Sequence, residues 1–217
     1  GSMREALSLI RALRVGRPND ISLLRLEATL LVDTGQADTA VELIRKSKRP
    51  RPTAEKTGGG EAVVVSPADE FSDLLFISNL YTRAKRGRDA IETANQALSL
   101  ASGTERRQIA KTTLATALQT NGDPAAAERV LREVLHEVPG NPMALNNLGF
   151  FLTERGERLD EAVRLITQAL KVDPENPSYL DSLGWAYLWL GRLDDAEKYL
   201  TDAVRFDPDS STIREHL

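Results

Sequence analysis

The sequence predicts an all-α chain organised as an α-solenoid, a stack of antiparallel helix hairpins. Three observations lead to this prediction. Columns of equivalent residues recur every 34 or 35 residues, apolar residues inside each period follow helical spacing, and Gly or Pro stands where each helical stretch should end. A period of this length is typical of arrays in which each repeat is one supersecondary unit.

The recurrence is clearest in the C-terminal half of the chain. Leu183-Gly184 is preceded by Leu148-Gly149 at a step of 35 residues and by Leu114-Ala115 at a further step of 34. Three more columns repeat with the same two steps: Gly122, Gly156 and Gly191; Ala127, Ala162 and Ala196; Pro139, Pro174 and Pro208. The order of the two steps places one inserted residue between Gly156 and Ala162.

The same phase extends toward the N-terminus with two interruptions, of three residues near positions 104–107 and of sixteen residues before position 90. We expect residues 1–48 to hold a half repeat and one repeat, and residues 49–70 to form a flexible insertion rich in Pro and Gly. Residues 71–217 should hold four repeats, at 71–104, 108–141, 142–176 and 177–210, and the start of a truncated one. The insertion is either a mobile surface loop or a tether that lies on a binding surface.

Each repeat is predicted to contain two helices. In the last repeat, apolar residues fall at helical spacing in two successive stretches: Leu180, Leu183 and Tyr187, then Leu193, Ala196 and Leu200. Gly191 separates the stretches, and Pro208 ends the second because the residue before Pro leaves the helical region. Asp123-Pro124, Asn141-Pro142 and Asn176-Pro177 each supply a helix N-cap followed by Pro in the first turn.

Small residues mark where the two helices of a hairpin should approach most closely. Gly149 and Gly184 recur in the first helices, and Ala162 and Ala196 recur in the second. Helices about 8–10 Å apart touch only where one side chain at the crossing is small.

In this pattern the chain resembles tetratricopeptide repeat proteins. The family pattern is a large residue, Leu-Gly, Tyr, Ala, Phe and Pro, and it is met by Leu180, Leu183, Gly184, Tyr187, Ala196, Leu200 and Pro208. The resemblance covers nearly everything outside residues 49–70 and is weaker over 1–48, where Glu27-Ala28 replaces Leu-Gly. It implies a right-handed superhelix whose first helices line a concave groove, and binding of peptides or partner proteins rather than catalysis.

The composition excludes several kinds of chemistry. Cys is absent and only His136 and His216 are present, so disulfides, thiol nucleophiles and multi-His metal centres are excluded. The acidic residues at 154–161 alternate with Arg155 and Arg158, which indicates a solvent-exposed corner rather than an active site. The glycines at 58–60 lack the Gly-Lys-Ser/Thr of a phosphate loop. We therefore predict no enzyme activity, no cofactor and no metal.

Charge and hydropathy limit the class of partner. The net charge is −4, and residues 141–217 carry 14 acidic and 8 basic residues, so a basic footprint for nucleic acid is missing. No apolar run approaches the ~20 residues of a membrane-spanning helix, so we predict no direct membrane insertion. The expected partner is a protein or a peptide.

The candidate partner-binding groove is formed by the second stripe on each first helix. Its residues near the C-terminal end are Asn146, Asn147, Phe150, Asp181, Trp185 and Trp189. Large aromatic rings beside polar groups make effective binding anchors, and Asn side chains can pair with a peptide backbone. The alternative is that these rings pack on a neighbouring repeat.

We expect a non-enzymatic interaction scaffold that binds a peptide or a partner helix in this groove. Two alternatives stay open: a structural module that self-associates through open repeat ends, and a regulatory repeat region of a larger enzyme. Many tetratricopeptide repeat proteins that hold the C-termini of chaperones clamp two carboxylates with Lys, Asn and Arg side chains in the groove. We do not expect such a clamp here, because only Asn147 matches one of these positions.

Both ends of the chain are predicted to interrupt a repeat. Met3–Val15 resembles a second helix without its first, and Ser211–Leu217 resembles the opening of a first helix. Gly1-Ser2-Met3 is typical of residues left by cloning. Cytoplasmic and periplasmic or exported locations therefore both stay open.

Overall fold

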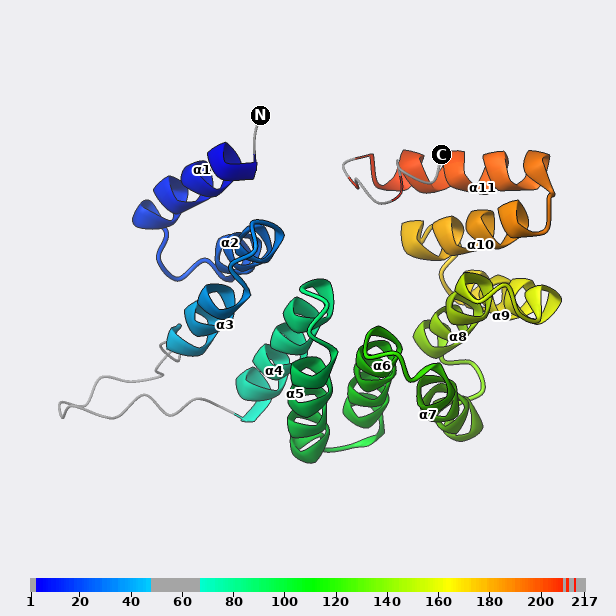
Figure 1. Ribbon diagram of the computed structural model, residues 1–217, viewed down its shortest axis with the longest axis horizontal. Helices are drawn as coiled ribbons and strands as arrows, with labels where there is room; N and C mark the ends of the chain where they lie inside the picture. Colours follow the sequence, from blue (N-terminus) through cyan, green and yellow to red (C-terminus); the bar gives the residue numbers. More distant parts are fainter. Residues whose placement is uncertain (1–2, 48–66, 209, 211–212, 214–217) are drawn as a thin grey trace. The chain divides into compact units, whose positions relative to one another are not determined.

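The structure, a computed structural model, describes residues 3–47 and 67–208 together with residues 210 and 213 (Figure 1). These residues form eleven helices: α1 (Met3–Gly16), α2 (Ile21–Asp33), α3 (Ala37–Lys46), α4 (Pro67–Arg83), α5 (Gly87–Leu100), α6 (Thr104–Thr120), α7 (Pro124–Glu137), α8 (Pro142–Glu154), α9 (Leu159–Val172), α10 (Pro177–Trp189) and α11 (Leu193–Phe206). They contain no strand, which confirms the all-α prediction.

Two predicted segments fall largely outside the described residues. These are residues 49–66 of the insertion and, apart from Ile213, the opening of a further helix at 211–217. Among the helices that are described, none combines the length and the apolarity that crossing a membrane requires.

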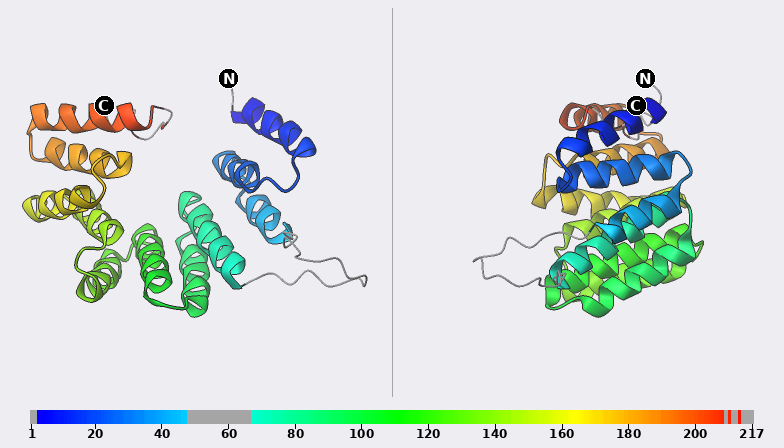
Figure 2. Two further views of the ribbon diagram at one scale, coloured as in Figure 1. Left: turned by 180° about the vertical axis from the view of Figure 1, so that it is seen from behind. Right: turned by 90° about the vertical axis from the view of Figure 1, so that its left-hand side faces the viewer.

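The chain divides into two compact units, unit 1 over Gly1–Gly122 and unit 2 over Asp123–Leu217. In unit 1, α1 packs on α2, α2 on α3, and α4 on α5 and α6. In unit 2, α8 pairs with α9 and α10 pairs with α11, while α10 also contacts α8 and α9. Figures 1 and 2 show the antiparallel course of α10 and α11. Within each unit, the helices therefore form the stacked hairpins that the repeat predicts.

The predicted start and stop signals of unit 2 lie at helix ends. The side-chain oxygens of Asp123, Asn141 and Asn176 accept hydrogen bonds from backbone N–H groups in the first turns of α7, α8 and α10. In each case Pro follows at a position where the helix needs no N–H donor. Gly156 and Gly191, just after α8 and α10, have φ angles of +64° and +71°, a conformation that glycine adopts without steric cost.

The small residues of the first helices lie where hairpin partners approach most closely. A Cβ atom on Gly184 would lie 2.7 Å from Cγ of Leu200, and one on Gly149 would lie 2.5 Å from Cγ1 of Ile166. Both distances are too short for real atoms. These contacts confirm that Gly is required at the crossings of α8 with α9 and of α10 with α11.

The apolar stripes of the last hairpin form a core that continues into its neighbour. Leu183, Tyr187 and Ala196 pack with Ile166 of α9, so the core of one hairpin contacts that of the preceding one. At the other end of α10, Leu180 packs with Ala203 and Ile213. An individual hairpin leaves one apolar face uncovered, and stacking the hairpins buries it.

The interruptions of the repeat lengthen helices or alter one turn. The extra residues near 104–107 lie within α6, which has 17 residues where α8 has 13. Helix α4 also has 17 residues and begins at Pro67, inside the range 49–70 that the sequence assigns to the insertion. The single residue inserted after Gly156 leaves Arg158 with a left-handed φ of +46° at the start of α9.

Glu27, which replaces the usual Leu of the Leu-Gly column, is buried in unit 1 with 5% of its surface exposed. Its carboxylate accepts a hydrogen bond from Nε of Arg11 at 3.0 Å and another from Arg14. Both arginines lie on α1. The departure from the family pattern is therefore an ion pair that links α1 to α2.

The sequence pattern predicts that the corner between α8 and α9 is solvent-exposed. The structure instead shows a partly buried ion-pair network at this corner. Glu128 of α7 accepts hydrogen bonds from Arg132 at 2.9 Å, Arg155 at 2.9 Å and Arg158 at 2.6 Å, and Glu161 joins the network through Arg132. The side chains of Glu128 and Arg155 are only 18% and 17% exposed. The hydrogen bond from Arg158, helped by those from the other two arginines, lowers the pKa of Glu128 to about 2 although burial opposes this.

Candidate partner-binding site

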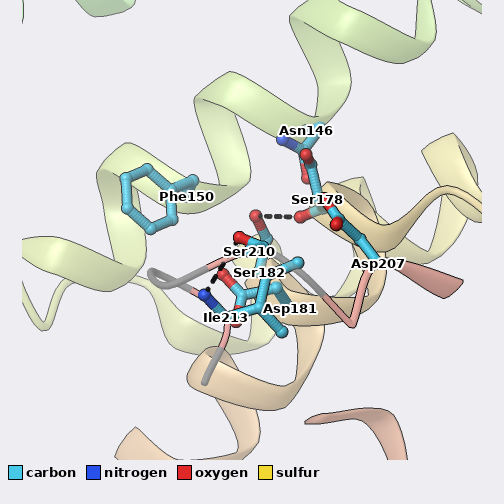
Figure 3. Close-up of a pocket in the computed structure, with 8 residues that line it drawn as sticks. All are labelled: Asn146, Phe150, Ser178, Asp181, Ser182, Asp207, Ser210 and Ile213. Atoms are coloured by element: carbon cyan, nitrogen blue, oxygen red, sulfur yellow. Dashed lines mark hydrogen bonds between the residues drawn. The ribbon is translucent and has the colours of Figure 1, made fainter. Parts of the chain in front are cut away.

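A pocket of about 320 Å³ opens in unit 2 between α8, α10 and residues that follow α11 (Figure 3). Its lining residues are Asn146, Phe150, Ser178, Asp181, Ser182, Asp207, Ser210 and Ile213. One aromatic and one aliphatic side chain thus stand beside amide, hydroxyl and carboxylate groups. Six of the eight lining residues are polar, so this pocket is more polar than the mostly apolar sites that bind small molecules.

Helical spacing explains why these side chains share one space. Asn146 and Phe150 are four residues apart on α8 and therefore lie on the same face. Ser178, Asp181 and Ser182 follow the same rule on α10. The cap residue Asn176 fixes the first turn of α10 by accepting hydrogen bonds from two backbone N–H groups, at 3.1 Å and 3.3 Å.

Several polar groups of the pocket already have partners. The hydroxyl of Ser182 donates to the carbonyl oxygen of Ser178 at 2.8 Å, and the N–H of Ile213 donates to Oγ of Ser210 at 3.4 Å. Asn146 is different. It is 7% exposed, and its Oδ1 accepts no hydrogen bond from the described part of the chain. An unsatisfied buried acceptor costs about 1–3 kcal/mol, and this oxygen is closed to solvent as well as unpaired.

The structure brings together three of the six candidate groove residues. Asn146, Phe150 and Asp181 line the pocket, whereas Asn147 and the two tryptophans are not among its lining residues. Trp185 is half-buried on α10. Trp189 is 49% exposed, and its ring lies against Gly156, within 3.2 Å of where a Cβ atom would be.

Three lining residues come from a part of the chain that sequence reasoning did not connect with the site. Asp207, Ser210 and Ile213 follow α11 and close one side of the pocket. Ile213 is buried against Leu180 and Ala203. The repeat phase predicts the opening of another helix near these residues, and that phase was the only available signal for them.

In unit 1, the corresponding stripe on α4 is occupied by contacts from α2. Arg25 donates to Oγ of Ser72 at 2.9 Å, and its guanidinium lies 5.0 Å from the ring centroid of Phe76. Arg83 donates to Oδ2 of Asp33 at 2.9 Å. These side chains join neighbouring repeats.

The described residues offer no site for a metal ion, because they contain no group of three or more His, Cys, Asp or Glu side chains that could hold one. The pocket presents amide and hydroxyl groups, two carboxylates and an aromatic ring.

Comparisons with known proteins agree with this geometry. Two models of the tetratricopeptide repeat match residues 118–179 and 154–211. The TPR repeat-containing protein PA4667 of Pseudomonas aeruginosa is 32% identical over 175 residues, which cover 79% of this chain and 26% of the relative. The chain therefore spans about a quarter of the length of this relative.

Solved structures share the fold at lower identity. TTC0263, a thermophilic TPR protein of Thermus thermophilus, aligns with a TM-score of 0.61 and 21% identity over 88% of this chain and 93% of that protein. The pilF protein of Pseudomonas aeruginosa aligns with a TM-score of 0.56 and 22% identity over 69% and 67% of the two chains. The hairpin geometry, the matching repeat models and the curated relative together identify this chain as a tetratricopeptide repeat protein, a member of a family of protein–protein interaction scaffolds.

Proposed function

We propose that the chain is a non-enzymatic scaffold that binds a peptide or a partner helix on the surface formed by α8 and α10. The observation that carries this proposal is the pocket between these helices, with Asn146, Phe150 and Asp181 in its lining. Phe150 offers apolar area to a ligand, beside the polar side chains of Ser178 and Ser182. We include Trp185 and Trp189 in the proposed surface because they follow Asp181 at steps of four residues on α10.

Selection of peptides from a phage-displayed dodecapeptide library on the full chain tests this proposal. Enriched peptides are synthesised with a fluorescent label, and their affinity is measured by fluorescence polarisation. Phe150→Ala and Trp185→Ala should each weaken binding at least about tenfold, as expected for anchor residues. Leu193→Ala is the matched control, since Leu193 is exposed on α11 outside the pocket, and it should leave the affinity unchanged.

Circular dichroism and thermal melting of each variant show whether a loss of binding reflects a loss of folding. The proposal fails if no peptide is enriched, or if Leu193→Ala weakens binding as much as Phe150→Ala does. It also fails for Trp185 if Trp185→Ala destabilises the chain by ~3 kcal/mol or more, a loss typical of a core side chain.

A second candidate function, self-association, is favoured by α1. This helix buries Leu7 and Ile10 but exposes Leu9 and Leu13, which lie four residues apart on one face. An exposed apolar stripe of this kind supports association with another copy of the chain. Light scattering over a range of concentrations should then show a rise in mass that Leu9→Lys abolishes. A constant monomeric mass would exclude this function.

A further inference from the structure

We infer that α1 and α2 form a dimer interface, in which α1 of a second copy lies against α1 where a first helix lies in the other hairpins. This inference rests on self-association, the second candidate function, and identifies the element of the second copy that makes the contact. Six of the twelve exposed large hydrophobic side chains of the described residues lie in residues 3–26. Such a concentration of exposed apolar area marks an interaction surface.

The repeat shows which kind of element the exposed side of α1 fits. Ala6 belongs to the Ala column of the second helices, whose members in α3, α5, α9 and α11 are at most 2% exposed: Ala40, Ala90, Ala162 and Ala196. Each of these four helices pairs with the first helix of its own hairpin. Seven residues further along α11, Ala203 is fully buried and packs with Leu180 of α10, whereas the equivalent Leu13 of α1 is 46% exposed. The exposed side of α1 therefore has the position that a first helix covers elsewhere.

The neighbouring face of α2 fits the same element. The position two residues before the small residue of the crossing is Phe76 in α4 and Ser182 in α10, and both are contacted from the preceding first helix. The guanidinium of Arg25 on α2 lies 5.0 Å from the ring centroid of Phe76. Ser182 is 5% exposed and lines the pocket together with Phe150 of α8. On α2 the equivalent residue is Leu26, which is 45% exposed. A helix placed on the exposed side of α1 would cover Leu26 as well.

The exposed stripe of α1 is complementary to a second copy of itself. Ala6, Leu9 and Leu13 are spaced by three and four residues and therefore share one face. In an antiparallel pair related by a two-fold axis near Leu9, the two Leu9 side chains meet and Ala6 of each helix faces Leu13 of the other. A small residue then stands opposite a large one, as Gly184 stands opposite Leu200 in the last hairpin.

Charge favours the same antiparallel pairing. Helix α1 has Glu5 in its first turn and Arg14 in its last turn, and Arg17 follows the helix. Antiparallel pairing places the acidic start of each helix beside the basic end of the other and opposes the two helix dipoles. The stripe itself is uncharged, and it borders Leu7 and Ile10 on the buried side of α1. A second copy would therefore extend the existing contact of α1 with α2 without bringing like charges together.

Light scattering on the full chain tests the closed dimer. The mass should rise with concentration from 23.9 kDa to a plateau at twice this value, because a two-fold contact uses both surfaces and leaves none for a third copy. Two helices from each copy make a small interface, so we expect a dissociation constant of about 1–100 μM.

Charged substitutions at Leu9 test whether the two Leu9 side chains meet. Leu9→Lys and Leu9→Glu should each keep the mass at that of one chain, because like charges would face each other at the axis. An equimolar mixture of the two variants should restore the dimer, because opposite charges would then meet. Ser8→Lys is the matched control, since Ser8 is exposed on another face of the same helix, and it should leave the dissociation constant within about twofold of wild type.

Disulfide formation tests the register, and the absence of Cys from the chain makes each introduced thiol unique. Leu9→Cys should form a disulfide between copies under mild oxidation, because the bond requires Cβ atoms about 3.5–4.5 Å apart. Ser8→Cys should not form one. In a mixture of Ala6→Cys and Leu13→Cys, the disulfide between the two variants should exceed either homodimeric disulfide at least about fivefold.

The outcomes separate this inference from the functions on which it rests. A mass that grows without a plateau, a mixture of Leu9 variants that stays monomeric, or equal cross-linking at Leu9 and Ser8 would overturn the inference and leave self-association standing. A constant mass of one chain would overturn both and leave the surface to a helix of a different protein. None of these results changes the expectation for peptide binding on α8 and α10, which the peptide selection tests separately.

Discussion

The ion-pair network around Glu128 allows a quantitative prediction about the stability of unit 2. Three arginines donate to this carboxylate, and its pKa lies at about 2, below the ordinary value of 4.5. A difference of about 2.5 pKa units corresponds to ~3 kcal/mol at 1.36 kcal/mol per unit. The network is partly open to solvent, which screens the interaction. We therefore expect Glu128→Gln to cost about 2 kcal/mol at pH 7.

The sign of the pH dependence follows from the direction of this difference. A carboxyl whose pKa is lower in the folded state binds more protons in the unfolded state, so it stabilises the fold above the ordinary pKa. The contribution of Glu128 should be complete above about pH 4.5 and should decline as the pH falls toward 2. In the Glu128→Gln variant this part of the pH dependence should be missing.

Urea unfolding followed by tryptophan fluorescence measures the stability of unit 2, which contains Glu128. Both tryptophans of the chain, Trp185 and Trp189, lie in α10, so their emission reports on unit 2. With an m-value of about 2 kcal/mol/M, the transition of Glu128→Gln should move down by about 1 M at pH 7. Glu197→Gln is the control, because Glu197 is exposed on α11 and forms no ion pair within the described residues.

The reasoning is refuted by either of two results. One is a midpoint for Glu128→Gln that differs from wild type no more than that of Glu197→Gln. The other is a stability difference between wild type and Glu128→Gln that stays constant from pH 7 to pH 3.5, since the pKa of Glu128 requires it to shrink.

Three further substitutions test the packing directly. Gly184→Ala should destabilise unit 2 by about 1–3 kcal/mol in urea unfolding, because the new Cβ atom would overlap Leu200. The control is Gly140→Ala, where the new Cβ atom meets nothing within 4 Å. Its stability should stay within about 0.5 kcal/mol of wild type. Glu27→Ala leaves two arginines on α1 without their anion and should raise hydrogen exchange in α1 and α2 by a factor equivalent to about 2 kcal/mol; unchanged exchange would contradict the ion pair. Asn176→Ala removes the cap of α10 and should lower the stability by about 1 kcal/mol, and an unchanged thermal midpoint would contradict the capping role.

The sequence by itself was sufficient for the features that depend on local interactions. The caps Asn141 and Asn176 and the stops at Gly156 and Gly191 act on residues within one turn, so their residue types alone predict helix boundaries. Gly184 was predictable as a close contact because the repeat fixes the partner helix, and the same period identified the family.

Only the tertiary structure decided which side chains meet across the stack. Asn146 of α8 shares a pocket with Asp207 after α11, and Glu128 of α7 is joined to Arg158 before α9. These pairs depend on the angle and separation of stacked helices, which are set by the packing of many side chains at once and leave no periodic trace in the sequence. For the same reason, helical periodicity assigned Asn146 and Trp189 to one predicted groove, whereas only the structure shows that Asn146 is buried in the lining of the pocket and that Trp189 is half-exposed and not among its lining residues.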